Sequence, residues 1–126
     1  MGDMVREFPR YRIADTQAPI SGRIDDIRWP FKLATFGNGG CGFHCVIRPP
    51  HLVIPKDVEC QFESRDALDE SIRVHGRLIY VTEVELEFGK KTFFYGIEFD
   101  RDHRNRVEPV AKFLEKLKNQ GKISNA

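Results

Sequence analysis

The spacing of the apolar residues changes once along this chain, near residue 100. Before that point, residues 58–62 alternate apolar and polar side chains, and apolar residues of one parity recur across 72–84. This period of two is typical of strands with one buried face. After that point, apolar residues recur three or four positions apart, as on one helix face: Val107, Val110, Leu114 and Leu117. The chain is therefore expected to be mainly β, with one C-terminal α-helix.

Turn-forming residues divide the first part of the chain into short strands. An apolar run over 31–36 follows Pro30 and is closed by Gly37 to Gly40, and Pro49 and Pro50 end the next run. Glycine and proline at such positions mark turns. Five or six short strands at this spacing favour a closed or nearly closed antiparallel barrel, because closure removes exposed sheet edges. We expect six strands with the helix packed on the barrel.

The ends of the helix carry their own signals. Gly121 supplies a stop after the last apolar position. The sequence allows two starting points for the helix. Asn105 with Glu108 matches a capping box, and Pro109 is a common type of first helical residue.

Length and charge limit the classes of protein that fit. The chain has 126 residues, which is the size of one domain, and a net charge of +1. We expect a flexible arm over 1–10, the barrel and helix over 11–121, and a tail over 122–126. A near-zero charge gives no general field that would attract DNA, RNA or an anionic membrane, so none of these is expected as a partner.

The cysteines and the first residues indicate a reducing compartment. The chain has three cysteines, and an odd number without a Cys-x-x-Cys pair argues against a disulfide framework. The N-terminal residues are charged and lack the apolar core of a signal peptide, so a cytoplasmic location is expected. Cys41 and Cys45 would face one side of a strand and His44 the other, which favours buried thiols and predicts no metal site.

Two short segments predict an anion site. Arg6 and Arg10 lie four residues apart just before the first β-like run, and Thr35 to Gly40 is a glycine-rich turn. Guanidinium groups bind phosphate and the O6/N7 edge of guanine with two hydrogen bonds and also stack on bases. The segments also fit plain readings, namely a solvated basic arm and an ordinary β-turn.

These two segments resemble the signature of the PilZ domain, an Arg-x-x-x-Arg segment and an Asp/Asn-x-Ser-x-x-Gly segment. The resemblance extends over nearly the whole chain through three further stretches: 54–58, 75–80 and 95–100. It implies a six-stranded antiparallel PilZ-type β-barrel with a C-terminal α-helix packed on it and a flexible N-terminal arm.

The resemblance also implies a ligand, cyclic di-GMP, and no other cofactor. The residues that it assigns to the ligand are Arg6, Arg10, Thr35, Gly37, Gly40 and Tyr80. Thr35 stands where the family has Asp or Asn, and Gly37 stands where it has Ser. Losing one or two polar contacts of this kind weakens binding by about 10- to 1000-fold. Restoring aspartate at position 35 and serine at position 37 is therefore expected to tighten binding.

The function implied by the resemblance is that of a non-enzymatic receptor. Its N-terminal arm would order on the nucleotide and change the surface seen by an effector protein, in bacterial signalling that controls motility, biofilm formation or virulence. The protein would be a monomer or a homodimer. The alternative is a PilZ-fold adaptor that does not bind the nucleotide, for example in type IV pilus assembly. The altered turn favours the adaptor, and the intact arginine pair favours the receptor.

Overall fold

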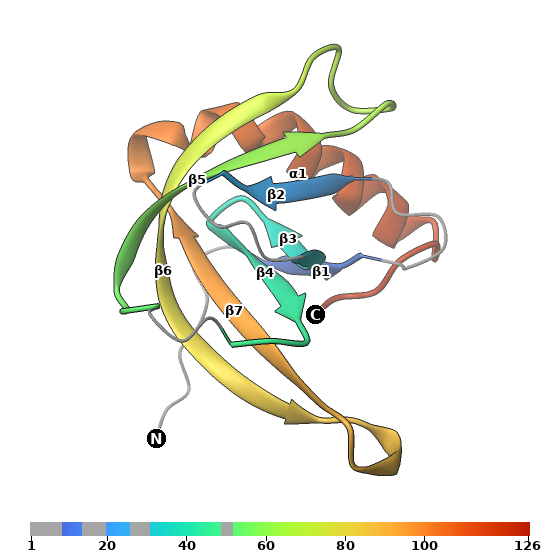
Figure 1. Cartoon of the computed structure of the whole chain (residues 1–126). Helices are drawn as coiled ribbons and strands as arrows, with labels where there is room; N and C mark the ends of the chain where they lie inside the picture. Colours follow the sequence, from blue (N-terminus) through green and yellow to red (C-terminus); the bar gives the residue numbers. More distant parts are fainter. Residues whose placement is uncertain (1–8, 14–19, 26–30, 49–51) are drawn as a thin grey trace.

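The computed structural model describes residues 9–13, 20–25, 31–48 and 52–126. These residues form seven strands, followed by one α-helix (Figure 1). The elements are β1 (Arg10–Arg12), β2 (Ser21–Ile24), β3 (Lys32–Gly37), β4 (Gly40–Cys45), β5 (Lys56–Glu63), β6 (Ile72–Glu85), β7 (Lys91–Phe99) and α1 (Arg104–Asn119), with 3-10 turns at Glu87–Gly89 and Arg101–His103.

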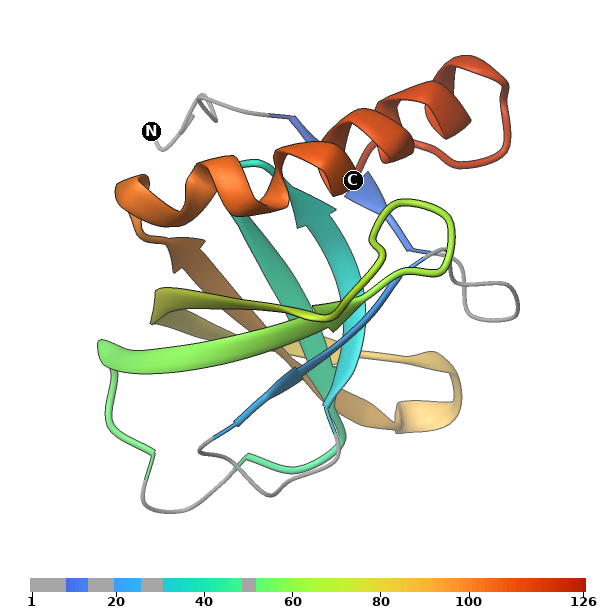
Figure 2. The ribbon, with the colours of Figure 1, turned by 90° about the horizontal axis from the view of Figure 1, so that it is seen from above.

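All seven strands form one antiparallel sheet in the order β1-β3-β4-β7-β6-β5-β2. The sheet is strongly curled, and β2 at one edge also contacts β3 near the other edge, so the barrel is almost closed (Figure 2). The predicted mainly β fold with a C-terminal helix is confirmed. The predicted count of six strands is wrong by one. Short edge strands such as β1, with three residues, are defined by their pairing partners and leave little periodicity in the sequence.

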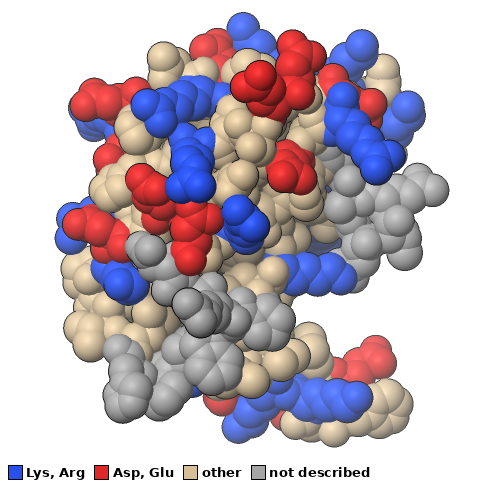
Figure 3. All heavy atoms as spheres, turned by 45° about the horizontal axis from the view of Figure 1, so that its top comes forward, with Lys and Arg blue, Asp and Glu red and all other residues tan. Residues whose placement is uncertain are grey.

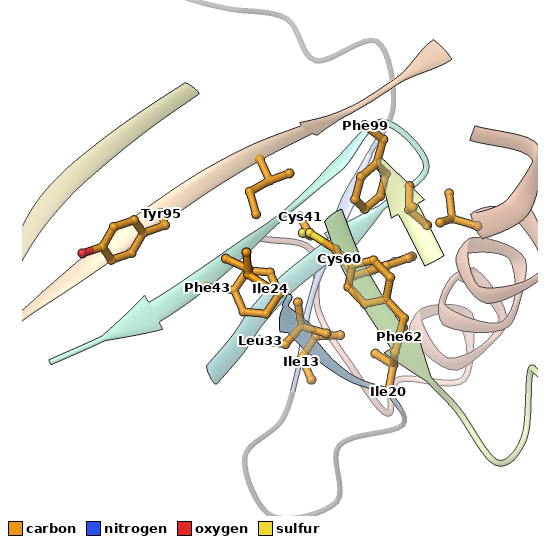
Figure 4. Close-up of a cluster of buried hydrophobic side chains, with 14 of the residues drawn as sticks. Ile13, Ile20, Ile24, Leu33, Cys41, Phe43, Cys60, Phe62, Tyr95 and Phe99 are labelled. Carbon is orange, nitrogen blue, oxygen red and sulfur yellow. The ribbon is translucent and has the colours of Figure 1, made fainter. Parts of the chain in front are cut away.

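The concave side of the sheet and α1 enclose one core. Three aromatic rings meet at its centre, with centroid distances of 5.0 Å for Phe36–Phe62 and 5.7 Å for both Phe36–Phe99 and Phe62–Phe99 (Figure 4). Two of these pairs are edge-to-face, which is a favoured geometry for buried aromatic rings. The helix buries the predicted apolar stripe against them: Val107, Val110 and Leu114.

The start of α1 lies earlier than either predicted position. A 3-10 turn after β7 runs directly into the helix, so the first helical residue is Arg104 and Pro109 lies inside the helix. Neither the Asn105 capping box nor a start at Pro109 is therefore correct. The predicted stop is confirmed, since Gly121 has a φ of +74° and its N–H donates to the carbonyl of Lys118. No helix in the described ranges is long and apolar enough to cross a membrane.

A histidine pair joins the start of α1 to the sheet. His75 of β6 lies with its Nδ1 2.6 Å from Asp100 Oδ2, and its backbone N–H donates to His103 Nδ1 at 2.9 Å. The hydrogen bond to Asp100 is the main reason that the pKa of His75 is raised above its ordinary value.

The C-terminal segment, which the sequence analysis treats as a tail, extends the sheet at β1. The N–H of Arg12 donates to the carbonyl of Ser124 at 2.8 Å, and the N–H of Ala126 donates to the carbonyl of Arg10 at 3.0 Å. A β-bridge between Tyr11 and Asn125 lies between these two bonds. Backbone hydrogen bonds therefore hold β1 from both sides, by β3 and by residues 124–126.

Residues 85–91 connect β6 and β7 as a hairpin that extends beyond the barrel. β5 pairs with β6 only as far as Leu78, and β4 pairs with β7 only as far as Phe93. The last rows of the β6–β7 ladder, Val84 with Thr92 and Glu85 with Lys91, therefore project as a two-stranded ribbon (Figure 1).

Removing the central ring of the core should strongly destabilise the fold. Phe36 is fully buried, and we expect Phe36→Ala to lower the free energy of unfolding by about 3–5 kcal/mol through lost burial and a residual cavity. Urea unfolding followed by circular dichroism measures this change. In the matched control, Val53→Ala at a 75% exposed position should change the free energy by less than about 0.5 kcal/mol. Equal effects of the two variants would contradict this core.

The pair of His75 and Asp100 should make stability depend on pH. The pKa of His75 is higher in the folded protein than its ordinary value, so protonated His75 stabilises the folded state at pH values below the ordinary pKa. This stabilisation is lost as the pH rises through the raised pKa. We expect Asp100→Asn to destabilise the protein by up to about 1 kcal/mol near pH 6, because the pair is partly exposed, and by less near pH 9. Urea unfolding at both pH values tests this. Asp102→Asn, an exposed neighbour, should show no such difference.

Candidate functional site

The structure brings Arg10 onto the glycine-rich turn between β3 and β4. Arg10 is the register partner of Gly37. A Cβ atom at Gly40 would lie 2.6 Å from Arg10 Nη2 and 2.2 Å from the carbonyl oxygen of Ile97. The guanidinium therefore rests against Gly40 at a distance that only glycine permits. Arg6, the other predicted arginine, lies outside the described residues.

The backbone of Pro9 lies so close to position 37 that this position also requires glycine. A Cβ atom at this position would lie 2.2 Å from the carbonyl oxygen of Pro9 and 3.1 Å from Arg10 Cγ. Real Cβ atoms do not come so close to a carbonyl oxygen, so a serine could fit only if Pro9 moved. Pro9 thus occupies the space in which a side chain at position 37 would lie.

One register row crosses the outer face of the sheet from β1 to β6. Successive partners in this row are Arg12, Thr35, Gly42, Gly96 and Tyr80. Directly paired residues point to the same face, so Thr35 and Tyr80 lie on one surface. They are three strand spacings apart, about 14 Å along the sheet.

Aromatic rings occupy the space above the two glycines in the middle of this row. A Cβ atom at Gly96 would lie 2.1 Å from Tyr80 Cε1, and one at Gly42 would lie 2.1 Å from Phe94 Cζ. The rings of Tyr80 and Phe94 are themselves stacked, with centroids 6.1 Å apart and planes 27° apart. Tyr80 thus packs on its own sheet, with its ring over Gly96.

Polar atoms without partners lie beside these residues. Within the described ranges, Thr35 Oγ1 and Asn38 Oδ1 are buried and have no hydrogen-bond partner. Thr35 Oγ1 also lies 2.7 Å from where a Cβ atom of Gly42 would stand. Buried polar atoms are nearly always paired, so these two atoms mark a place where a polar group is expected to bind.

A groove of about 760 Å³ opens next to Thr35, between β3, β4 and the C-terminal segment. Its described lining includes three cationic side chains and no carboxylate side chain. The cations come from three separate parts of the chain: Arg12, Lys32 and Lys122. His44 and Phe94 meet edge-to-face in the wall, with centroids 5.2 Å apart. Cations beside aromatic rings suit an anionic, aromatic ligand.

Sequence reasoning did not identify Arg12, Lys32, Phe94 or Lys122 as site residues. The sequence does contain a signal for Arg12, because Arg12 lies two positions from Arg10 in a strand and therefore on the same face of the sheet. Lys122 had none, since only the pairing of the C-terminal segment with β1 carries it to the groove.

The cysteine cluster is not part of this surface. Cys41 and Cys45 are buried on the core side of β4, whereas His44 lines the outer groove. Burial raises the pKa of the Cys41 thiol, and contact with Cys60 adds to the effect. Among the residues that the structure describes, no group of three His, Cys, Asp or Glu side chains could hold a metal ion.

Comparison with solved structures identifies the fold as PilZ-like. The chain is similar to the PilZ domain with c-di-GMP of YcgR from Escherichia coli, with a TM-score of 0.70 and 17% identity over 94% of this chain and 97% of that one. It is also similar to the K. pneumoniae MrkH–c-di-GMP complex, with a TM-score of 0.67 and 16% identity over 93% of this chain and 54% of that one. No family model and no curated protein matches the sequence.

The packing of Pro9 reverses the expectation for a serine at position 37. We expect Gly37→Ser to displace Pro9, to destabilise the protein by about 1–3 kcal/mol and to loosen β1, since overpacking forces backbone shifts. Urea unfolding gives the stability, and hydrogen exchange of the amides in Arg10–Arg12 reports on β1. Unchanged stability together with unchanged exchange would contradict the close approach of Pro9 to Gly37.

Proposed function

We propose that this protein is a cyclic di-GMP receptor that binds the nucleotide on the outer face around the β3–β4 turn. The observation that carries the proposal is the contact of the Arg10 guanidinium with Gly40, because the two separate halves of the predicted signature meet there. Both similar structures hold this nucleotide, which supports the same ligand class for this chain.

The proposed contacts follow from the chemistry of the surface. Arg6 and Arg10 would bind phosphate or the guanine edge, since guanidinium donates two parallel hydrogen bonds to such groups. Thr35 would use its unpartnered hydroxyl, and Gly37 and Gly40 would let the backbone and Arg10 come close. Tyr80 would stack on the second base, given its place on the same face as Thr35.

Cations of the groove can compensate for the two lost family side chains. Thr35 cannot accept as strongly as a carboxylate, and Gly37 offers no hydroxyl. Arg12 and Lys122 lie along the same groove as Thr35, and a charge-assisted hydrogen bond contributes about 1.5–3 kcal/mol. Two such bonds would offset the missing contacts.

The proposed output is a change in a protein-interaction surface. Residues 1–10 would act as the arm: Arg6 would close over the nucleotide, and Arg10, fixed in β1, would hold it on the turn. An effector protein would then recognise the closed form. We assign no catalytic role to the chain.

A second candidate is an adaptor of the same fold that does not bind the nucleotide. The specific observation in its favour is that Pro9 occupies the space beside Gly37 where a serine side chain would stand. The arginine on the turn and the unpartnered Thr35 hydroxyl count against it.

Calorimetric titration with cyclic di-GMP distinguishes the two candidates. We expect micromolar binding, on the order of −8 kcal/mol, and at least a tenfold loss of affinity for Arg10→Ala and for Arg6→Ala. The matched control is Arg65→Ala in the exposed loop between β5 and β6, which should leave affinity unchanged. If wild type releases no heat and shows no change in unfolding temperature at high nucleotide concentration, the adaptor is the correct assignment.

A further inference from the structure

The exposed large apolar side chains of the described ranges lie in two connections of the chain. Val46, Ile47 and Val53 lie between β4 and β5, and Leu86 and Phe88 lie at the tip of the β6–β7 hairpin. Phe88 is 95% exposed. An apolar tip of this kind is a candidate contact for another molecule.

The tip residue is also in an unfavourable backbone conformation. Phe88 has a φ of +62°, in the left-handed region that glycine and asparagine tolerate and bulky residues avoid. A phenylalanine here therefore costs the isolated chain twice, through exposed apolar surface and through backbone strain. Neither cost contributes to the core, because the ribbon projects beyond the barrel.

A site that suits this tip lies at the base of the same hairpin. The groove beside Thr35 has apolar walls from Leu33, Phe94 and Ile123, and Phe94 is only two residues from the projecting part of β7. Figure 3 shows a hollow between the hairpin and the rest of the molecule, wide enough to be open to solvent. The described lining of the groove includes no residue of the hairpin tip, so the tip does not fill the groove of its own chain.

The charges of the two surfaces are complementary. Glu85 and Glu87 flank Leu86 at the tip, and Lys90 lies opposite them, so residues 85–90 carry two negative charges and one positive charge. Lys91 is paired with Glu83 at 3.6 Å. The groove presents cations and, in its described lining, no carboxylate side chain. A tip with a net negative charge thus matches a groove bordered by cations.

We propose that two copies of this chain form a closed pair in which each hairpin tip enters the groove of the other copy. Phe88 and Leu86 would contact the apolar walls, and Glu87 would face Lys122 at the rim. Each copy has one tip and one groove, so a twofold arrangement uses both surfaces once and leaves no open end for polymerisation.

The pairing would regulate nucleotide binding, a consequence that rests on the proposed function. Arg12 and Thr35 line the groove and continue onto the face that holds Arg10. A nucleotide on that face and a hairpin in the groove therefore compete for the same cations. Cyclic di-GMP would convert the pair to monomers and expose Phe88 to another partner.

Analytical ultracentrifugation of the full chain over a wide concentration range tests the pairing. We expect a reversible monomer–dimer equilibrium for wild type and at least tenfold weaker dimerisation for Phe88→Asn. Asparagine tolerates positive φ, so this variant should fold at least as stably as wild type in dilute solution. Val53→Ala, at a 75% exposed position in the connection between β4 and β5, should dimerise as wild type does. A wild type that stays monomeric, or a Phe88→Asn variant that dimerises normally, overturns the proposal.

A charge exchange tests which groove the tip enters. Lys122→Glu and Glu87→Lys should each weaken dimerisation, and the double variant should restore it, because the pair is then reversed in sign. No recovery in the double variant overturns this placement of the tip. Calorimetry separates this proposal from the proposed function. If the protein binds the nucleotide but never dimerises, only the pairing is contradicted. If the protein dimerises and the nucleotide does not weaken the dimer, only the competition is contradicted.

Discussion

The outer surface of this protein depends on how β1 is held against β3. The strand has only three residues, yet the carbonyl of Pro9 and the side chain of Arg10 pack directly over Gly37 and Gly40. Residues 124–126 add hydrogen bonds on its other side. A strand this short has few contacts of its own, so tight packing and a second pairing partner must fix it. Because β1 carries Arg10 and Arg12, its placement determines where the cations of the face lie.

The sequence was informative where a residue's role depends on its near neighbours. The period of two in the strands, the helical spacing after residue 100 and the stop at Gly121 each follow from local preference, and each is found in the structure. The assignment of Arg10 to the turn rested on family resemblance, and the structure places the two in contact. The roles of all six residues in binding remain predictions: Arg6, Arg10, Thr35, Gly37, Gly40 and Tyr80.

The features that the sequence did not predict all depend on distant residues. The groove needs the C-terminal segment, which reaches it by pairing with β1 more than a hundred positions earlier in the chain. The helix starts at Arg104 directly after a 3-10 turn, and the backbone of His75 on β6 donates a hydrogen bond to His103 in that turn. No capping rule contains that contact. The close approach of Pro9 to Gly37 depends on the pairing of β1 with β3, which no local pattern in the sequence indicates.

The length of β6 gives the molecule a mechanical property. This strand has 14 residues, about 46 Å at the usual rise, and runs without interruption from the contact with α1 to the hairpin tip. Its register shifts once, between Leu78 and Tyr80, at the level of the outer row. A register shift of this kind bends a strand locally and lies here near the middle of β6. Because the hairpin tip is at the far end of the strand, any change in this bend would displace the tip further than the residues near the bend.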